Sequence, residues 1–93
     1  MTRDGLSFLG RPLPPAFRVR AVVIAPGGAR RYAEAEWADA IVVVERGAID
    51  LEFLGGGRTR YVRGDTLTLS ELALRALHNR GAEPALLVAV SRR

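Results

Sequence analysis

Short stretches of alternating or continuous hydrophobic residues, separated by glycine and proline turns, run along most of the chain. The strongest are Ala40 to Glu45 (AIVVVE), with three consecutive valines, and Ala85 to Val90 (ALLVAV). Phe17 to Ala25 (FRVRAVVIA) begins with alternation and ends as an apolar run. Stretches of this length, rich in β-branched residues, predict strands. Short strands with recurring turn signals favour an all-β sandwich or barrel.

The middle of the chain predicts a β-hairpin. Ala48 to Leu54 alternates apolar with acidic residues, Gly55-Gly56-Gly57 turns the chain, and Arg58 to Val62 returns. With the three glycines as the loop, Glu52 would lie roughly opposite Arg60, and opposite charges across two strands stabilise such a register by a few tenths of a kcal/mol. These charges would face water, while the apolar residues of the first strand would face the core: Ile49, Leu51 and Phe53.

The segment from Ser70 to His78 (SELALRALH) carries conflicting signals. It is rich in Ala, Leu, Glu and Arg, which favour a helix, with Ser70 as N-cap and Gly81 as stop. The segment before it, Thr66 to Leu69, alternates as a strand does. Because β-rich surroundings often override local propensity, we predict a strand here as well.

The chain is expected to form one domain, since it has 93 residues of which 48% are hydrophobic. Residues 1 to 16 contain clustered glycines and prolines and predict an N-terminal arm; residues 17 to 93 predict the barrel. A barrel of this size has edge strands to protect, so we expect a homodimer. The arm, from Leu6 to Ala16, could contribute by crossing to the neighbouring subunit.

Neither a membrane nor a nucleic acid is expected as a partner. No apolar run is long enough to cross a bilayer, and the first ten residues lack the apolar core of a signal peptide, so a cytoplasmic location is the default. The net charge of +4 comes from arginines scattered among acidic residues. No helix-turn-helix, aromatic RNA-binding motif or zinc module accompanies them, which favours a solvated surface over a nucleic-acid footprint.

Three missing or rare residue types exclude several kinds of chemistry. The chain has no cysteine, which excludes disulfides, thiolate nucleophiles and zinc-thiolate sites. All fourteen basic residues are arginine, so no lysine can form a Schiff base. The single histidine, His78, excludes a metal site built from two or three histidines of one chain.

From about residue 27 to 90 the sequence resembles the cupin superfamily of small β-barrels. Arg46 to Glu52 is similar to the turn and strand that end the first cupin motif, and Arg63-Gly64-Asp65 is similar to the start of the second. Asn79 to Leu87 (NRGAEPALL) resembles the asparagine, turn and last strand that follow. The resemblance implies an all-β fold, a single cupin-like β-barrel of jelly-roll type with about seven to nine strands.

The same alignment finds none of the four usual cupin metal ligands. Counting from Gly28, Glu34 and Glu36 fall at the two histidine positions of the first motif; counting from Gly27 instead places alanines there. Ala40 falls at the metal-binding glutamate and Arg75 at the histidine of the second motif. We therefore expect neither a metal nor another cofactor.

His78 does not replace the missing ligand in this alignment. It lies three residues beyond Arg75, and an odd shift along a strand moves a side chain to the opposite face. If Arg75, Leu77 and Asn79 point into the barrel, His78 points outward. A histidine on the surface or at a subunit contact is the expectation.

The resemblance places Glu34, Glu36 and Arg75 together at a barrel mouth. Two carboxylates could share acid–base work there, and Arg75 could bind a ligand carboxylate or phosphate. Alternatively the two glutamates form a solvated loop with which Arg75 pairs. Trp37 and Tyr61 could line a pocket for a small apolar or aromatic ligand, or belong to the core or a subunit interface.

Three interpretations of function therefore stay open. The first is a metal-free, non-catalytic cupin that binds a small molecule or serves as an accessory or sensor module. The second is a metal-independent isomerase or lyase that uses Glu34 or Glu36 as base and Arg75 as anion clamp. The third is a structural barrel with a packed interior. A cavity lined by these three residues would favour the enzyme, and a filled apolar barrel would disfavour it.

Overall fold

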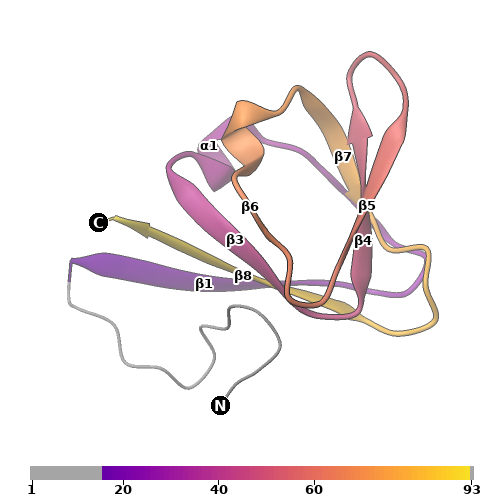
Figure 1. Cartoon of the computed structure of the whole chain (residues 1–93), viewed down its shortest axis with the longest axis horizontal. Helices are drawn as coiled ribbons and strands as arrows, with labels where there is room; N and C mark the ends of the chain where they lie inside the picture. Colours follow the sequence, from indigo (N-terminus) through magenta and orange to yellow (C-terminus); the bar gives the residue numbers. More distant parts are fainter. Residues whose placement is uncertain (1–15, 93) are drawn as a thin grey trace.

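The computed structural model describes residues 16 to 92, which form two four-stranded antiparallel sheets (Figure 1). The elements are β1 (Phe17–Ile24), β2 (Ala29–Arg31), α1 (Glu34–Trp37), β3 (Ala40–Arg46), β4 (Ala48–Phe53), β5 (Arg58–Val62), β6 (Thr66–Leu67), the 3₁₀ turn η1 (Leu69–Glu71), β7 (Leu74–His78) and β8 (Ala85–Arg92). The strand order is β1-β8-β3-β6 in the first sheet and β2-β7-β4-β5 in the second. The eight strands confirm the all-β prediction and its range of seven to nine. Apart from Ala16, the predicted arm lies outside the described residues.

The core lies between the two sheets and follows the alternation of the strands. Val22 and Ile24 of β1 face inward, as do Val42 and Val44 of β3, and their neighbours face the other side. The second sheet contributes Ile49, Leu51 and Leu77, all at most 1% exposed. Trp37 from α1 and Leu69 from η1 are completely buried against the same cluster. No helix among residues 16 to 92 is long and apolar enough to cross a bilayer.

The segment with conflicting signals resolves into both kinds of structure. Leu69–Glu71 forms one 3₁₀ turn, and Leu74–His78 forms strand β7, which pairs with β4 on one side and β2 on the other. The strand prediction is therefore confirmed for the second half of the segment only. Strand β2 and helix α1 were not predicted, because three and four residues are too few to display a periodic pattern.

The hairpin between β4 and β5 is confirmed, but its predicted register is wrong by two residues. Glu52 lies opposite Arg58, and Asp50 lies opposite Arg60. The hydrogen bond from the Phe53 N–H to the carbonyl of Gly57, at 3.2 Å, continues this register, so the turn lies at Leu54, Gly55 and Gly56 and not at the three glycines. This shift of the turn by one residue moves each pairing by two positions and keeps the apolar residues on the core face.

Asn79 and its turn join the two sheets. Its Nδ2 donates to the carbonyls of Ile24 at 2.9 Å and Glu83 at 2.6 Å, and its Oδ1 accepts from the Gly81 N–H at 2.9 Å. The side chain is 1% exposed. The asparagine of the cupin-like motif thus holds the β7–β8 connection against the end of β1.

Candidate functional site

Arg75 does not lie beside Glu34 and Glu36, and the predicted Arg–Glu pair is wrong. Leu74 and Leu77 both face the core although they are three residues apart, so the strand accommodates an extra residue there, a β-bulge. Arg75 therefore turns to the outer face of the second sheet. Its Nε lies 3.7 Å from Glu52 Oε2, its terminal nitrogen donates to the Leu54 carbonyl at 3.3 Å, and its side chain is 57% exposed.

His78 also lies on this outer face, as the sequence predicted. Its Nε2 is 2.8 Å from Glu52 Oε1, and Arg58 lies 3.9 Å from the same oxygen. The hydrogen bond from His78 is the largest cause that lowers the pKa of Glu52, with the charges of Arg58 and Arg75 adding to it. The outer face of the second sheet thus carries a cluster of four charged or polar side chains: Glu52, Arg58, Arg75 and His78. The sheet separates this cluster from the barrel interior.

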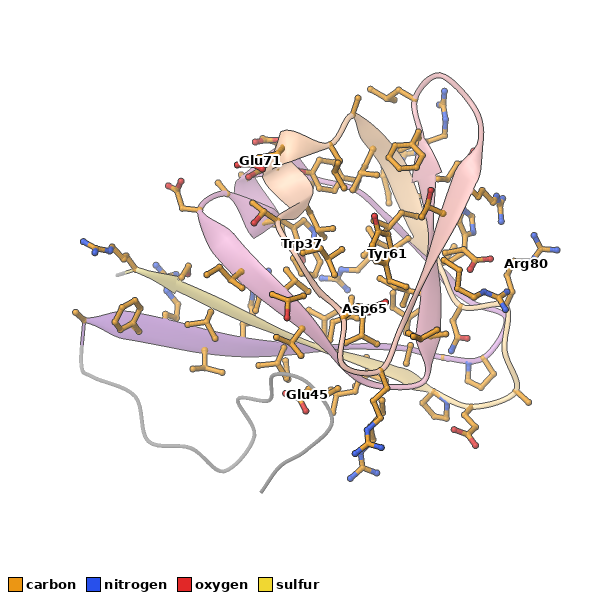
Figure 2. All side chains as sticks on the ribbon, in the orientation of Figure 1. Trp37, Glu45, Tyr61, Asp65, Glu71 and Arg80 are labelled. Carbon is orange, nitrogen blue, oxygen red and sulfur yellow. The ribbon has the colours of Figure 1, made fainter. Side chains whose placement is uncertain are left out.

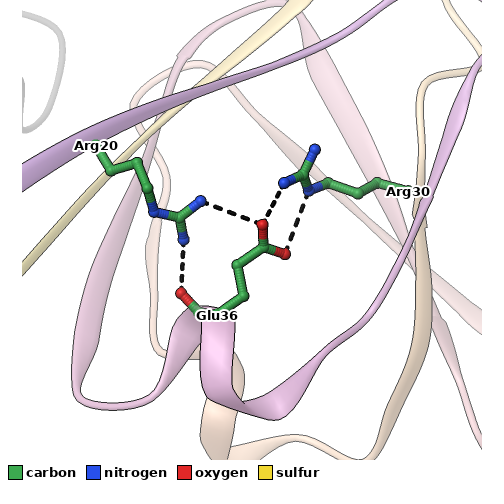
Figure 3. Close-up of polar contacts among 3 residues, drawn as sticks. All are labelled: Arg20, Arg30 and Glu36. Carbon is green, nitrogen blue, oxygen red and sulfur yellow. Dashed lines mark hydrogen bonds and ion pairs between the residues drawn. The ribbon is translucent and has the colours of Figure 1, made fainter.

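Glu36 forms the centre of a charged cluster at one end of the barrel (Figure 3). Arg30 donates to both of its carboxylate oxygens, with Nε 3.3 Å from Oε1. Arg20 donates to Oε2 at 3.3 Å and to the backbone carbonyl of Glu36 at 2.6 Å. Arg20 comes from β1, Arg30 from β2 and Glu36 from α1, so the cluster connects both sheets to the helix. The hydrogen bond from Arg30, more than any other interaction, lowers the pKa of Glu36.

Glu34 is exposed and makes a different contact. It accepts a hydrogen bond from the Tyr32 hydroxyl at 2.9 Å. Burial of Tyr32, together with this hydrogen bond, raises the pKa of its hydroxyl to about 12. Glu34 and Glu36 therefore have separate partners and do not act as a carboxylate pair.

Trp37 and Tyr61 belong to the core or its margin. Trp37 is completely buried (Figure 2), and Tyr61, which is partly buried, packs against the core cluster. The guanidinium carbon of Arg20 lies 4.9 Å from the centroid of the Trp37 ring, in a cation–π contact. The indole N–H has no hydrogen-bond partner within residues 16 to 92. The Trp37 ring thus packs against the guanidinium group of Arg20 and helps to fix its position.

A small cleft opens next to Arg20, between α1 and the ends of β1 and β8. Its volume is about 240 Å³. Its polar lining consists of Arg18, Arg20, Glu36, Asp39, Ser91 and Arg92, and its remaining lining is alanine: Ala35, Ala38, Ala40 and Ala89. Neither Arg18 nor Arg92 makes an ion pair with any described residue. The small alanine side chains leave the cleft open, and the guanidinium groups of the arginines supply hydrogen-bond donors along its lining.

The sequence interpretation missed most of this cleft. Only Glu36 belonged to the predicted site, whereas Arg18, Arg20 and Arg92 did not. A usable signal was present, because Arg18 and Arg20 alternate with Val19 and Ala21 and so share a face with the buried Val22 and Ile24.

The residues at the cupin metal positions do not fit a metal ion. No group of three His, Cys, Asp or Glu side chains comes together anywhere in the described part of the chain. Ala40, at the glutamate position, offers no donor atom, and Glu36 is bound between two guanidinium groups. His78, on the outer face, cannot contribute to a site in the barrel.

No protein-family model and no curated protein matches the chain. Among solved structures, the chain is similar to the Cupin_2 domain of an XRE family transcriptional regulator from Enterobacter cloacae, with 20% identity and a TM-score of 0.62 over 86% of this chain and 90% of that one. It is also similar to a cupin domain from Bordetella pertussis, with 21% identity and a TM-score of 0.60 over 100% of this chain and 98% of that one.

A third similar structure is a sugar phosphate isomerase of the cupin superfamily from Silicibacter pomeroyi, with 27% identity and a TM-score of 0.59. The match covers 84% of this chain but only 51% of that one, so the chain spans about half of its length.

Proposed function

Because this chain folds as a small cupin domain, we propose that it is a metal-free binding module for a small anionic molecule, held in the cleft between β1, α1 and β8. The observation that carries the proposal is the lining of that cleft. Arg18 and Arg92 face it without an ion-pair partner among residues 16 to 92, and Arg20 faces it already held in position. Unpaired guanidinium groups at a cleft are suited to bind a carboxylate or a phosphate.

The size of the cleft limits the ligand. Its volume of about 240 Å³ lies below the range of about 300–1,000 Å³ that is usual for sites of drug-sized molecules. This favours inorganic phosphate, a short carboxylic acid or a small phosphorylated sugar. The Ser91 hydroxyl, on the same wall, can donate a further hydrogen bond. The similar structure described as a sugar phosphate isomerase supports the phosphate class.

Binding without catalysis is the better supported interpretation. A general base works best with a pKa near the working pH, and the lowered pKa of Glu36 makes it a weak base. Arg75, the proposed anion clamp of the enzyme interpretation, lies on the other side of the second sheet. A role as an accessory or sensor module agrees with the similar domain described as part of a transcriptional regulator.

Isothermal titration calorimetry with inorganic phosphate and with glucose 6-phosphate tests this proposal at low ionic strength. Arg18→Gln should weaken binding about tenfold or more, since a hydrogen bond to a charged group contributes about 1.5–3 kcal/mol. Arg31→Gln is the matched control, because Arg31 is an exposed arginine of β2 outside the cleft lining. Absence of binding to the unmodified protein, or equal weakening by both variants, would contradict the proposal.

A further inference from the structure

The cleft that holds the arginines also contains a free acid. Asp39 lines it from the turn between α1 and β3. Its side chain is exposed, and its carboxylate makes no ion pair or hydrogen bond with any residue from 16 to 92. A carboxylate in this position repels a ligand that carries only negative charge. A ligand that fits the whole cleft must therefore accommodate a negative charge on one side of it.

The backbone at position 39 accounts for the shape of this residue but not for its charge. Asp39 has a φ of 58°, the only positive value for a residue other than glycine among residues 16 to 92. Glycine, asparagine and aspartate all tolerate this left-handed region. Asparagine would serve the turn equally well without adding a negative charge to a cleft lined by arginines.

The strand register places the acid and the arginines on opposite sides of the cleft. Arg18 of β1 pairs with Ser91 of β8, and Ser91 pairs with Ala40 of β3, so these three residues form a row across the sheet. Asp39 directly precedes Ala40. Because neighbouring strands lie about 4.8 Å apart, the backbones of β1 and β3 are separated by about 10 Å in this row. The cleft thus has a cationic side on β1 and an acidic side at the start of β3.

The free charges of the cleft match a ligand that carries both signs. Arg20 is already bonded to Glu36, whereas Arg18 and Arg92 make no ion pair among residues 16 to 92. Two free guanidinium groups and one free carboxylate leave the cleft with a surplus of one positive charge. A phosphate monoester has a charge of about −2, so the same molecule with an ammonium group has a net charge of about −1. Such a ligand balances the surplus.

We propose that the ligand of the cleft is a small amino-substituted phosphate ester, whose phosphate binds the arginines and whose ammonium group binds Asp39. This inference rests on the proposed function, because it assigns the other end of the same ligand. An ammonium group offers the carboxylate a full positive charge and three N–H donors, whereas a hydroxyl group offers one donor and no charge. Asp39 is therefore a specificity-determining residue of the cleft.

Isothermal titration calorimetry with three phosphates that differ in one group tests this inference. Aminoethyl phosphate, hydroxyethyl phosphate and ethyl phosphate share the phosphate and the carbon chain, so a difference in affinity arises at the far end of the ligand. The full chain is titrated at low ionic strength, where charges are least screened, and at about pH 8, where the phosphate is a dianion and the ammonium group stays protonated. Aminoethyl phosphate should bind about fivefold or more tightly than either of the others.

Asp39→Asn separates recognition of the ammonium group from an effect on the fold. Asparagine keeps the left-handed backbone and removes the negative charge. The variant should bind aminoethyl phosphate more weakly, and it should bind ethyl phosphate as tightly as before or more tightly, because the repelling carboxylate is gone. Glu71→Gln is the matched control, since it removes the same charge from an exposed acid of η1 outside the cleft and should leave all three affinities unchanged.

Three results would overturn this inference while the anion site stands, because ethyl phosphate still binds in each. Equal affinities for aminoethyl and ethyl phosphate would show that Asp39 does not contact the ligand. Equal affinities for aminoethyl and hydroxyethyl phosphate would show that Asp39 accepts a hydrogen bond without selecting a cation. Equal weakening of all three ligands by Asp39→Asn would show a structural role. Failure of all three phosphates to bind the unmodified protein would contradict the proposed function, and this inference with it.

Discussion

Replacing Asn79 with alanine should destabilise the protein by about 2–4 kcal/mol. The side chain, which is 1% exposed, makes three hydrogen bonds to backbone groups of two different segments. Alanine can make none of them. The loss should loosen the β7–β8 connection from the end of β1 and affect the whole barrel.

The magnitude follows from which partners water can reach. The carbonyl of Ile24 belongs to a residue that is 4% exposed, and loss of a partner at a buried group costs about 1–3 kcal/mol. Glu83 and Gly81 are exposed, so water can replace Asn79 there, and each of these two lost bonds costs about 0.5 kcal/mol, the low end of the usual range. At about 4–8 °C per kcal/mol for a domain of this size, the melting temperature should fall by about 8–30 °C.

Thermal and urea unfolding followed by circular dichroism would measure this loss. Asn79→Asp retains an oxygen for the Gly81 N–H but directs a carboxylate oxygen at the carbonyls of Ile24 and Glu83. It should therefore be at least as unstable as the alanine variant. Arg80→Ala, at the exposed neighbouring residue, should change the stability by no more than about 0.5 kcal/mol. An alanine variant as stable as the unmodified protein, or an aspartate variant more stable than it, would refute the hydrogen-bonding argument.

Three further predictions concern the backbone, the charged cluster and metals. Gly47→Ala should lower the urea midpoint by the equivalent of about 2 kcal/mol or more. Gly47 has a φ of 71°, and an added Cβ would lie 2.8 Å from the Pro84 carbonyl oxygen. Gly55→Ala is the control, because no atom lies within 4 Å of a Cβ added at Gly55. The pKa of Glu36 is lowered in the fold, so its stabilising contribution is present above its unfolded pKa of about 4.3 and is lost as the pH falls through the folded value. Glu36→Gln should therefore lose less melting temperature than the unmodified protein on acidification from about pH 5 to pH 2; equal losses would argue against this contribution. Zinc, manganese, nickel or iron(II) should leave the melting temperature of dialysed protein unchanged, and a saturable rise would show a metal site.

Alternation predicted the strands well because it depends on local spacing and one buried face. β1, β3, β4, β5 and β8 each begin at the predicted residue, and their ends differ by at most two positions. The resemblance to cupin turn sequences predicted how these strands assemble into a barrel. Gly47, Gly64-Asp65 and the Asn-x-Gly segment that begins at Asn79 all lie at connections between strands.

The position of Arg75 could not be predicted in the same way. Counting along a strand assumes that every residue pairs, but the bulge lets Leu74 and Leu77 both reach the core and turns Arg75 outward. That choice depends on how well two leucines fill the space between the sheets, which one sequence does not reveal. The cleft could not be predicted for a similar reason. The alternation of β1 indicates that Arg18 and Arg20 share the face of the inward residues, but it does not indicate that α1 packs beside them.

The stacking of Arg20 on Trp37 makes the candidate site optically observable. Trp37 is the single tryptophan of the chain, so all indole fluorescence arises from this one buried ring. Its neighbour, Arg20, lines the cleft. An anion that draws this guanidinium even slightly away from the ring would change the electric field at the indole, and with it the emission maximum and intensity. The fold thus carries its own reporter for occupancy of the cleft, which needs neither a label nor a known ligand and is suited to screening collections of small phosphates and carboxylates.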